Sequence, residues 1–217
     1  TAPGSTFKMV TSTAGLAENV ITTGTTINCT GVFRDVSNEP KCWIYPGSHG
    51  AETVSDAIRD SCNVFFYTTG FNLAAKDTGT YDDANGIAYI QKYASIYGLN
   101  QKTGIEIEEN TPEIATEFPV MAAIGQSDNN FTTVSLSRYV TAVASGKLYN
   151  YQLMSKIVDI NGNVIESYEP EYTDISDTLN AGQWDAIHSG MRMVVENLDS
   201  FEGFEIPVAG KTGTAQQ

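Results

Sequence analysis

Basic residues are scarce in this sequence. Its 217 residues include 12 lysines and arginines against 26 aspartates and glutamates, which gives a formal net charge of −14. The acidic residues are spread along the chain and do not form a tail. Because the mean field of such a chain repels polyanions, neither nucleic acid nor an anionic membrane surface is expected as a partner.

Long apolar runs, internal repeats and low-complexity linkers are also missing. No stretch approaches the roughly 18 apolar residues that a transmembrane helix needs, and no signal peptide opens the sequence. Hydrophobic residues nevertheless make up 41% of the chain, which is enough to bury a substantial core. One domain with an additional lobe is the expected organisation.

The short sequence patterns that bind metals are absent as well. The two histidines, His49 and His188, belong to no His-x-x-His or Glu-x-x-His pattern, and no Cys-x-x-Cys is present. Neither a metal site nor a cofactor is therefore expected. His49 lies in a Gly-Ser-His-Gly loop and His188 in an amphipathic stretch, and a structural role is predicted for both.

Cysteines are few, and their positions matter more than their number. Cys62 is expected to be a buried free thiol. Cys29 and Cys42 lie 13 positions apart in a loop-rich stretch. A disulfide between them would suit an extracytoplasmic protein and would stabilise it by roughly 3 kcal/mol. Two free thiols are the alternative.

Three short motifs are present in a defined order along the chain. They are Ser5-Thr6-Phe7-Lys8, Ser61-Cys62-Asn63 and Lys211-Thr212-Gly213-Thr214. Each motif alone is weak evidence for a catalytic site, because serine is a common helix cap and Lys-Thr-Gly is a common end to a strand. The ordered set is the signature of a serine acyl-transfer site.

The chemistry of acyl transfer explains the first motif. A serine hydroxyl is a poor nucleophile and needs a base within hydrogen-bond reach, together with donors for the developing oxyanion. Residues three apart on a helix share a face, so a helix that begins near Ser5 places Lys8 beside the hydroxyl. Unpaired N–H groups at that helix start favour negative charge.

Lys8 can act as a base only if an appreciable fraction of it is neutral. Burial and a second cation are the two available causes of a lowered pKa. Lys211 is the expected second cation if the first and third motifs converge in the folded chain.

Longer matches around the motifs make a family resemblance specific. Over nearly all 217 residues the chain resembles the transpeptidase domain of class B penicillin-binding proteins. The resemblance is carried by Pro3-Gly4-Ser5-Thr6-Phe7-Lys8, Lys41-Cys42-Trp43, Gly47-Ser48-His49-Gly50, Asp60-Ser61-Cys62-Asn63-Val64-Phe65-Phe66-Tyr67, Ile124-Gly125-Gln126 and Ala209-Gly210-Lys211-Thr212-Gly213-Thr214-Ala215-Gln216.

The resemblance implies an α+β fold, with a helical lobe and an antiparallel sheet that is incomplete here. Residues 1–217 would form a partial transpeptidase domain, from the active-site helix through the Lys-Thr-Gly strand. A membrane anchor and pedestal would lie upstream and further strands downstream, and the protein would work on the extracytoplasmic face of the cell membrane. Because a lone strand is unstable, we expect this chain to be inactive unless the Lys211 strand finds a partner.

The resemblance also implies residue roles. Ser5 would attack a stem peptide ending in D-Ala-D-Ala, Lys8 would take its proton, Ser61 would relay a proton to the leaving amine, and Asn63 would bind the substrate amide. The strand residues Lys211, Thr212, Gly213 and Thr214 would bind the terminal carboxylate, and the N–H groups of Ser5 and Thr214 would form the oxyanion hole. β-Lactams would acylate Ser5, and other cell-wall synthesis proteins would be partners.

Two alternative functions remain at this stage. A β-lactamase or β-lactam sensor shares the three motifs, and an inactive helical module would bind no penicillin. The segment Glu169-Pro170-Glu171 has the place in the motif order of the deacylating loop of class A β-lactamases, but it follows a predicted Asn-Gly hairpin, and Glu169 is expected at the surface. Ser127 departs from the family pattern after Ile124-Gly125-Gln126, and Gln126 is expected to be a structural residue near the site.

Hydrophobic spacing predicts the remaining elements. Helices are expected from Ser5 to Leu16 and over 51–60, 63–70, 87–97, 134–144 and 183–197, a hairpin over 153–158 and 164–168, and a strand over 208–215.

Overall fold

A computed structural model describes residues 1–214 and places one buried helix at the centre of the molecule. This helix, α1 (Lys8–Ala17), follows directly on a 3-10 turn, η1 (Gly4–Phe7). Every residue from Lys8 to Leu16 is buried, although several are mediocre helix formers. Their hydroxyls are satisfied: Ser12 donates to the Lys8 carbonyl and Thr11 to the Ala123 carbonyl. Tertiary packing therefore holds α1 in place.

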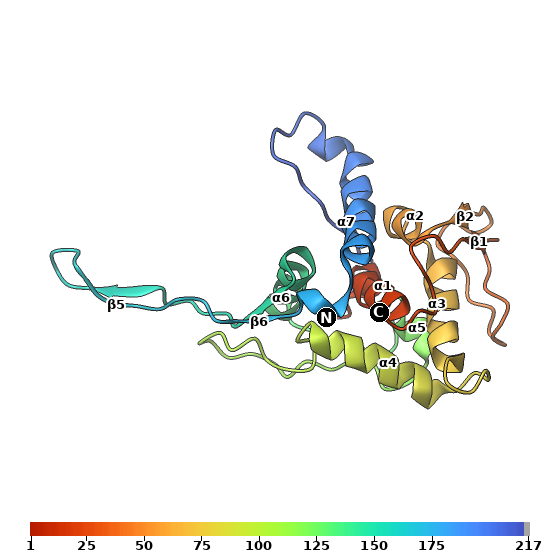
Figure 1. Ribbon diagram of the computed structural model, residues 1–217, viewed down its shortest axis with the longest axis horizontal. Coiled ribbons are helices and arrows are strands. Elements are labelled where there is room, and N and C mark those ends of the chain that lie inside the picture. The colour runs from red at the N-terminus through yellow and green to blue at the C-terminus, as the bar shows by residue number, and fades with distance from the viewer. Residues whose placement is uncertain (215–217) are drawn as a thin grey trace.

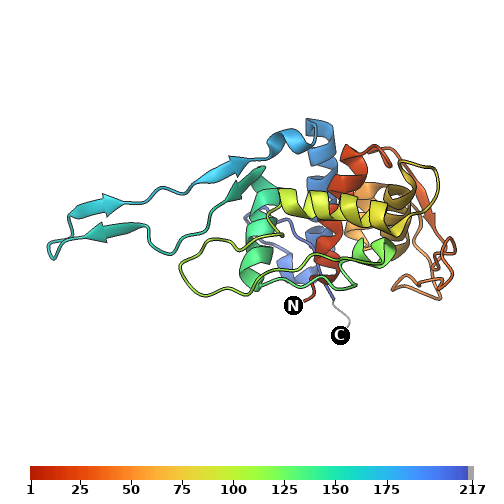
Figure 2. The same cartoon turned by 90° about the horizontal axis from the view of Figure 1, so that it is seen from below.

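The other helices surround α1 (Figures 1 and 2). They are α2 (Val54–Arg59), α3 (Asn63–Ala75), α4 (Asp83–Ile96), α5 (Pro119–Ala122), α6 (Thr133–Ser145) and α7 (Ala181–Glu196), with 3-10 turns η2 (Ser176–Thr178) and η3 (Asp199–Phe201). Helices α3 and α4 pack against α1 and against each other, while α2 packs against α7. Among the described helices, none combines the length and the apolar character of a membrane-crossing segment.

The strands in residues 1–214 are short and form three separate antiparallel pairs. They are β1 (Ile27–Cys29) with β2 (Gly50–Glu52), β3 (Lys147–Tyr149) with β6 (Tyr172–Asp174), and β4 (Lys156–Val158) with β5 (Val164–Ser167). In the first pair Cys29 lies opposite Gly50. The β4–β5 hairpin extends away from the helical body in both views (Figures 1 and 2). The expected α+β class is confirmed.

Most expected helices are present, and the differences have local causes. The helix predicted over 51–60 begins only at Val54, because Gly50–Glu52 pairs with β1 and Thr53 caps the helix through a capping box with Asp56. The helix predicted over 134–144 is present as α6 (Thr133–Ser145). The predicted hairpin is confirmed as β4–β5.

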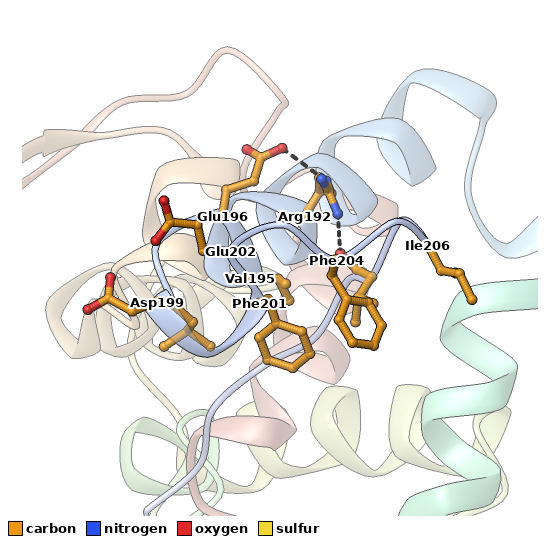
Figure 3. A pocket seen from close by; sticks show the side chains of 10 residues that line it. Arg192, Val195, Glu196, Asp199, Phe201, Glu202, Phe204 and Ile206 are labelled. Atoms are coloured by element: carbon orange, nitrogen blue, oxygen red, sulfur yellow. Dashed lines mark hydrogen bonds and ion pairs between the residues drawn. The ribbon is translucent and has the colours of Figure 1, made fainter.

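The strand predicted over 208–215 is wrong for the residues that the structure describes. Residues 208–214 form no strand, because no described segment pairs with them, and Ala215 lies outside the described residues. Helix α7 holds the segment instead. The Gly210 N–H donates to the Met191 carbonyl over 3.0 Å, and Arg192 donates to the Val208 carbonyl over 2.7 Å. Figure 3 shows Arg192 making this contact while it pairs with Glu196, beside a pocket at the end of α7.

Candidate active site

Residues of all three motifs meet in one open cleft of about 880 Å³. Ser5 contributes from η1, Ser61 and Asn63 from the start of α3, and Thr212 and Thr214 from the segment held by α7. The cleft is also lined by Lys41, Cys42, Trp43, Asp60, Tyr67 and Gln126. The fold thus brings together residues more than 200 positions apart in the sequence.

A close backbone contact positions Ser5. The preceding Gly4 donates its N–H to the Gly125 carbonyl over 3.1 Å. Gly125 has φ +74°, and a Cβ added there would lie 2.0 Å from the Gly4 carbonyl oxygen. Only glycine fits at this point, so the Ile124-Gly125-Gln126 segment forms the support of the Ser5 turn. The hydroxyl of Thr6 donates to the Pro3 carbonyl over 2.8 Å and closes the turn.

Lys8 is fully buried and joins the first motif to the second. Its Nζ donates to Asn63 Oδ1 over 2.6 Å, to the Ser61 carbonyl over 2.8 Å and to Ser61 Oγ over 3.1 Å. It also lies 5.4 Å from the centre of the Phe66 ring. All three donors of the ammonium group are therefore used by residues of the second motif.

Burial and, to a smaller extent, the positive charge of Lys211 together lower the pKa of Lys8 to about 7. Both causes were expected from the sequence. Near pH 7 a substantial fraction of Lys8 is neutral, which is the condition for a general base. The Lys211 ammonium is half-buried, and burial lowers its pKa to about 8.

The second motif sits in a strained turn at the start of α3. Ser61 has φ +52°, a left-handed conformation that is uncommon for a residue other than glycine. Strained backbone of this kind is concentrated at functional sites. Cys62 is the N-cap of α3, and its sulfur accepts the Phe65 N–H. Asn63 is the first residue of the helix, and its side-chain oxygen accepts the hydrogen bond from Lys8.

The third motif passes directly beside the first. A Cβ added at Gly213 would lie 2.8 Å from Thr6 Cγ2 and 3.2 Å from the Pro3 carbonyl oxygen. The Lys-Thr-Gly segment can approach the Ser5 turn this closely only because residue 213 has no side chain. The first and third motifs therefore lie side by side, which is the condition under which Lys211 was expected to act on Lys8.

The expected hydrogen bond between Lys8 and the Ser5 hydroxyl is not formed. Within the described residues, Ser5 Oγ has no hydrogen-bond partner, and Lys8 is occupied by Ser61 and Asn63. Catalytic hydrogen bonds of this kind are often long before substrate binds. Glu169 is exposed and does not line this cleft, as expected of a surface carboxylate.

A second cluster was not expected from the sequence. Cys29, Cys42 and Cys62 are all buried free thiols, which decides between the two alternatives for Cys29 and Cys42. The three sulfur atoms and a ring nitrogen of His49 all lie within 4.8 Å of one another. In chain order, Cys29, Cys42, His49 and Cys62 are separated by 13, 7 and 13 positions, so no short sequence pattern predicts the cluster. Loop folding alone brings it together.

The cleft thus has the composition of a serine–lysine acyl-transfer site. Ser5 lies at a helix start, and the buried Lys8, whose pKa is about 7, donates hydrogen bonds to Ser61 and Asn63. A second cation, Lys211, lies nearby. Residues 1–217 match the family described as penicillin binding protein transpeptidase domain. The chain belongs to this family.

Named relatives agree with the family. Peptidoglycan D,D-transpeptidase MrdA of Haemophilus influenzae is 30% identical over 249 aligned residues, which cover 99% of this chain and 34% of the relative. Penicillin-binding protein H of Bacillus subtilis is 27% identical over 181 residues, which cover 74% of this chain and 25% of that protein. The chain spans about a third or less of the length of these relatives.

Solved structures share the fold. A chain from the structure entitled "Structural coordination of polymerization and crosslinking by a peptidoglycan synthase complex" matches with a TM-score of 0.82 and 26% identity, over 100% of this chain and 37% of that one. Penicillin-binding protein 2B of Streptococcus pneumoniae matches with a TM-score of 0.81 at 22% identity, over 100% of this chain and 39% of the other.

Proposed function

We propose that this chain forms the catalytic part of a D,D-transpeptidase that cross-links peptidoglycan stem peptides through an acyl-enzyme on Ser5. The observation that carries the proposal is the environment of Lys8. It is buried, its pKa is lowered to about 7, and its Nζ lies within hydrogen-bond distance of the Ser61 and Asn63 side chains beside the cleft that Ser5 lines.

In the first step, neutral Lys8 takes the proton of Ser5 as its oxygen attacks the carbonyl carbon of the penultimate D-Ala. The developing oxyanion accepts hydrogen bonds from the backbone N–H groups of Ser5 and Thr214. The bond to the terminal D-Ala then breaks, and its amine receives a proton relayed through Ser61. An acceptor amine attacks the Ser5 ester in the second step, and Ser5 recovers its proton.

Substrate positioning is assigned to the other cleft residues. Asn63 hydrogen-bonds the peptide amide, while Lys211, Thr212 and Thr214 bind the terminal carboxylate, with Gly213 keeping that segment close to the Ser5 turn. The carboxylate charge suits a half-buried cation. A β-lactam carries a carboxylate and a strained amide, so it would enter the same site and acylate Ser5.

We further propose an extracytoplasmic location and partners in cell-wall synthesis for the protein that carries this chain. One structural neighbour, with a TM-score of 0.76, is the solved structure entitled "Complex between Penicillin-Binding Protein (PBP2) and MreC from Helicobacter pylori". Another belongs to a peptidoglycan synthase complex. We also propose that residues 1–217 form one part of a larger transpeptidase domain.

Intact-mass spectrometry after incubation with benzylpenicillin tests the proposed function. The wild-type chain should gain the mass of one whole benzylpenicillin, since ring opening releases nothing, and Ser5→Ala should gain none. Loss of the adduct over hours supports a transpeptidase, whereas loss within minutes would favour a β-lactamase. No adduct on the wild type would contradict activity of this chain and support the expectation that the Lys211 segment needs a strand partner.

A further inference from the structure

A second pocket adjoins the candidate active-site cleft. It has a volume of about 540 Å³ and forms where the loop between β1 and β2 meets α3, the start of α4, and α5. Asn38 and Met121 line both this pocket and the cleft that Ser5 lines. A group held in the pocket therefore lies at the edge of the cleft. We call it the aromatic–acidic pocket, and its lining includes Asp35, Phe71, Tyr81, Asp83, Phe118 and Met121.

Aromatic rings form part of the pocket wall. Phe71 and Tyr81 stack with ring centres 4.9 Å apart and planes 25° apart. Phe118, the N-cap of α5, is 54% exposed and has φ +54°, a left-handed conformation that is uncommon for a bulky residue. Aromatic faces attract cations and pack against aliphatic chains. The wall thus suits a ligand that combines an aliphatic stem with a positive charge.

The wall is held rigidly in place. Helices α3, α4 and α5 pack on one another (Figure 1). A Cβ added at Gly70 of α3 would lie 2.9 Å from the Pro119 carbonyl oxygen, and one at Gly86 of α4 would lie 2.7 Å from Pro119 Cβ. Phe118 directly precedes Pro119, so this close packing fixes its position. A pre-formed pocket loses little conformational freedom when a ligand binds.

The charge of the pocket is negative. Asp35 and Asp83 line it, and no lysine or arginine is among its described lining residues. Neither carboxylate forms an ion pair within residues 1–214, and Arg34, next to Asp35, donates instead to Thr30 Oγ1 over 3.3 Å. Asp83 lies beside the Tyr81 hydroxyl, whose pKa is raised by burial and by this carboxylate. Because a carboxylate accepts up to about four hydrogen bonds, both aspartates can still accept bonds from a bound cation.

The neighbouring cleft, in contrast, contains cations. Its lining includes Lys41 and Arg59 as well as Glu39 and Asp60, and the Lys8 ammonium donates to its lining residues Ser61 and Asn63. These cations suit the carboxylate of a donor peptide and repel an ammonium group. An acceptor with an aliphatic amine, whose ordinary pKa is about 10.4, arrives almost wholly protonated at pH 7. Such an acceptor is therefore favoured in the aromatic–acidic pocket over the cleft.

We propose that the aromatic–acidic pocket binds an alkylammonium group, with the charge facing Asp35 and Asp83 and the aliphatic stem against Phe71, Tyr81 and Phe118. Its occupant is the amine-bearing side chain of the acceptor peptide, which is held there as an ammonium group before it enters the cleft. Donor and acceptor thereby bind in adjoining sites of unlike charge. The identity of the occupant rests on the proposed function, whereas the affinity for alkylammonium groups does not.

Titration of the whole chain with Nα-acetyl-lysinamide, followed by amide NMR, tests the site. Shifts should be largest at the pocket residues Phe71, Tyr81 and Phe118. N-acetylnorleucinamide has the same aliphatic stem without the ammonium group and should bind about fivefold more weakly or not at all. Equal binding of the two compounds would overturn the proposal. So would shifts centred on Glu169 and Glu171, which line a separate acidic pocket and would report only the general attraction of a chain with net charge −14 for cations.

Two neighbouring aspartates give a matched pair of variants. Asp83→Asn removes a carboxylate from the pocket and should weaken binding of Nα-acetyl-lysinamide about threefold or more. Asp82→Asn removes the same charge one position away, but Asp82 is the N-cap of α4 and does not line the pocket. Asparagine caps a helix about as well as aspartate, so this variant should bind the compound like the wild type. Equal weakening in the two variants would overturn the proposal.

The assignment of the occupant has a separate readout. With a D-alanyl thioester as donor, the Ser5 ester is divided between water and an added acceptor peptide that carries a lysine side chain. Asp83→Asn should raise the acceptor concentration needed for half-maximal aminolysis about threefold. Acylation by benzylpenicillin, which has no ammonium group, should stay at the wild-type rate in this variant. An unchanged acceptor requirement would overturn the assignment to the acceptor.

The pocket and the proposed function fail separately. If the wild-type protein binds Nα-acetyl-lysinamide in the pocket but forms no penicillin adduct, the alkylammonium site stands, and the acceptor assignment falls with the proposed function. If it forms the adduct but binds no Nα-acetyl-lysinamide, the proposed function stands and the pocket proposal fails.

Discussion

Lys8 shows how one residue acquires its chemistry from its surroundings. A lysine in water is almost wholly protonated at pH 7. Here it is buried in the middle of a helical core, its ammonium group faces the oxygens of Ser61 and Asn63, and a second lysine lies nearby. Burial and like charge both disfavour the charged form, so the pKa of Lys8 falls to about 7.

The two lysines predict a bell-shaped pH dependence of acylation. Below the Lys8 pKa of about 7 the amine is protonated and cannot accept the Ser5 proton, so the rate should rise as pH increases through this value. Above the Lys211 pKa of about 8 that residue loses its charge and binds the carboxylate less well, so the rate should fall again. Second-order acylation rates of benzylpenicillin measured from pH 5 to 10 (about two units beyond each limb) would test this.

Replacement of Lys211 separates its two effects. Lys211→Met removes the positive charge that depresses the Lys8 pKa, so the rising limb of the profile should move to higher pH, while saturation should require more penicillin. Lys41→Met is the control, because Lys41 lines the same cleft but is not among the groups that shift the Lys8 pKa. An unmoved rising limb in Lys211→Met would show that the lysines do not interact.

At the scale of elements, the helices lie close to where the sequence predicts them, whereas the Lys-Thr-Gly segment does not form the predicted strand. Helices satisfy their own backbone hydrogen bonds, so local pattern predicts them. A strand needs a neighbour, and residues 208–214 have none among the described segments. The segment is positioned instead by Met191 and Arg192 of α7 and by the close approach of Gly213 to the Ser5 turn.

Gly125 gives a prediction about how elements meet. A side chain there would be strained by φ +74° and would collide with the Gly4 carbonyl, so Gly125→Ala should displace Ser5 and lower the free energy of unfolding by about 3 kcal/mol or more. Gly162→Ala is the matched control, with φ +85° but open space around it, and should cost only about 1 kcal/mol. Urea denaturation and penicillin acylation would measure both effects.

Similar losses of stability in the two glycine variants would refute the assigned role of the Gly4–Gly125 contact. An acylation rate that stays at the wild-type value in Gly125→Ala would refute the assignment as well, because Ser5 directly follows the residue that the new methyl group would strike.

At the scale of the whole molecule, the chain divides into a helical body and a projecting hairpin. The body contains the core and all residues of the candidate active site. The β4–β5 hairpin extends from it, and its apolar residues Ile157, Ile160 and Ile165 are all exposed (Figures 1 and 2). Beyond its base, the hairpin therefore contributes little buried apolar surface to the body.

Removal of the hairpin should accordingly leave the body intact. Replacement of residues 156–167 by a short Gly-Ser linker should change the free energy of unfolding by no more than about 0.5 kcal/mol, as expected for surface segments. The base contact from Gln152 to the Tyr168 carbonyl is kept in this variant. A loss of about 2 kcal/mol or more in urea denaturation would contradict the assigned independence of the hairpin.

The sequence by itself determined the helices, the β4–β5 hairpin, the order of the three motifs and the family, because these depend on local spacing and on residue identity. Tertiary structure alone decided what those residues become. It lowered the Lys8 pKa by burying it near Lys211, it replaced a predicted strand by a segment held on α7, and it gathered Cys29, Cys42, Cys62 and His49 into one cluster. Each of these outcomes depends on contacts between distant positions, and no local pattern encodes such contacts.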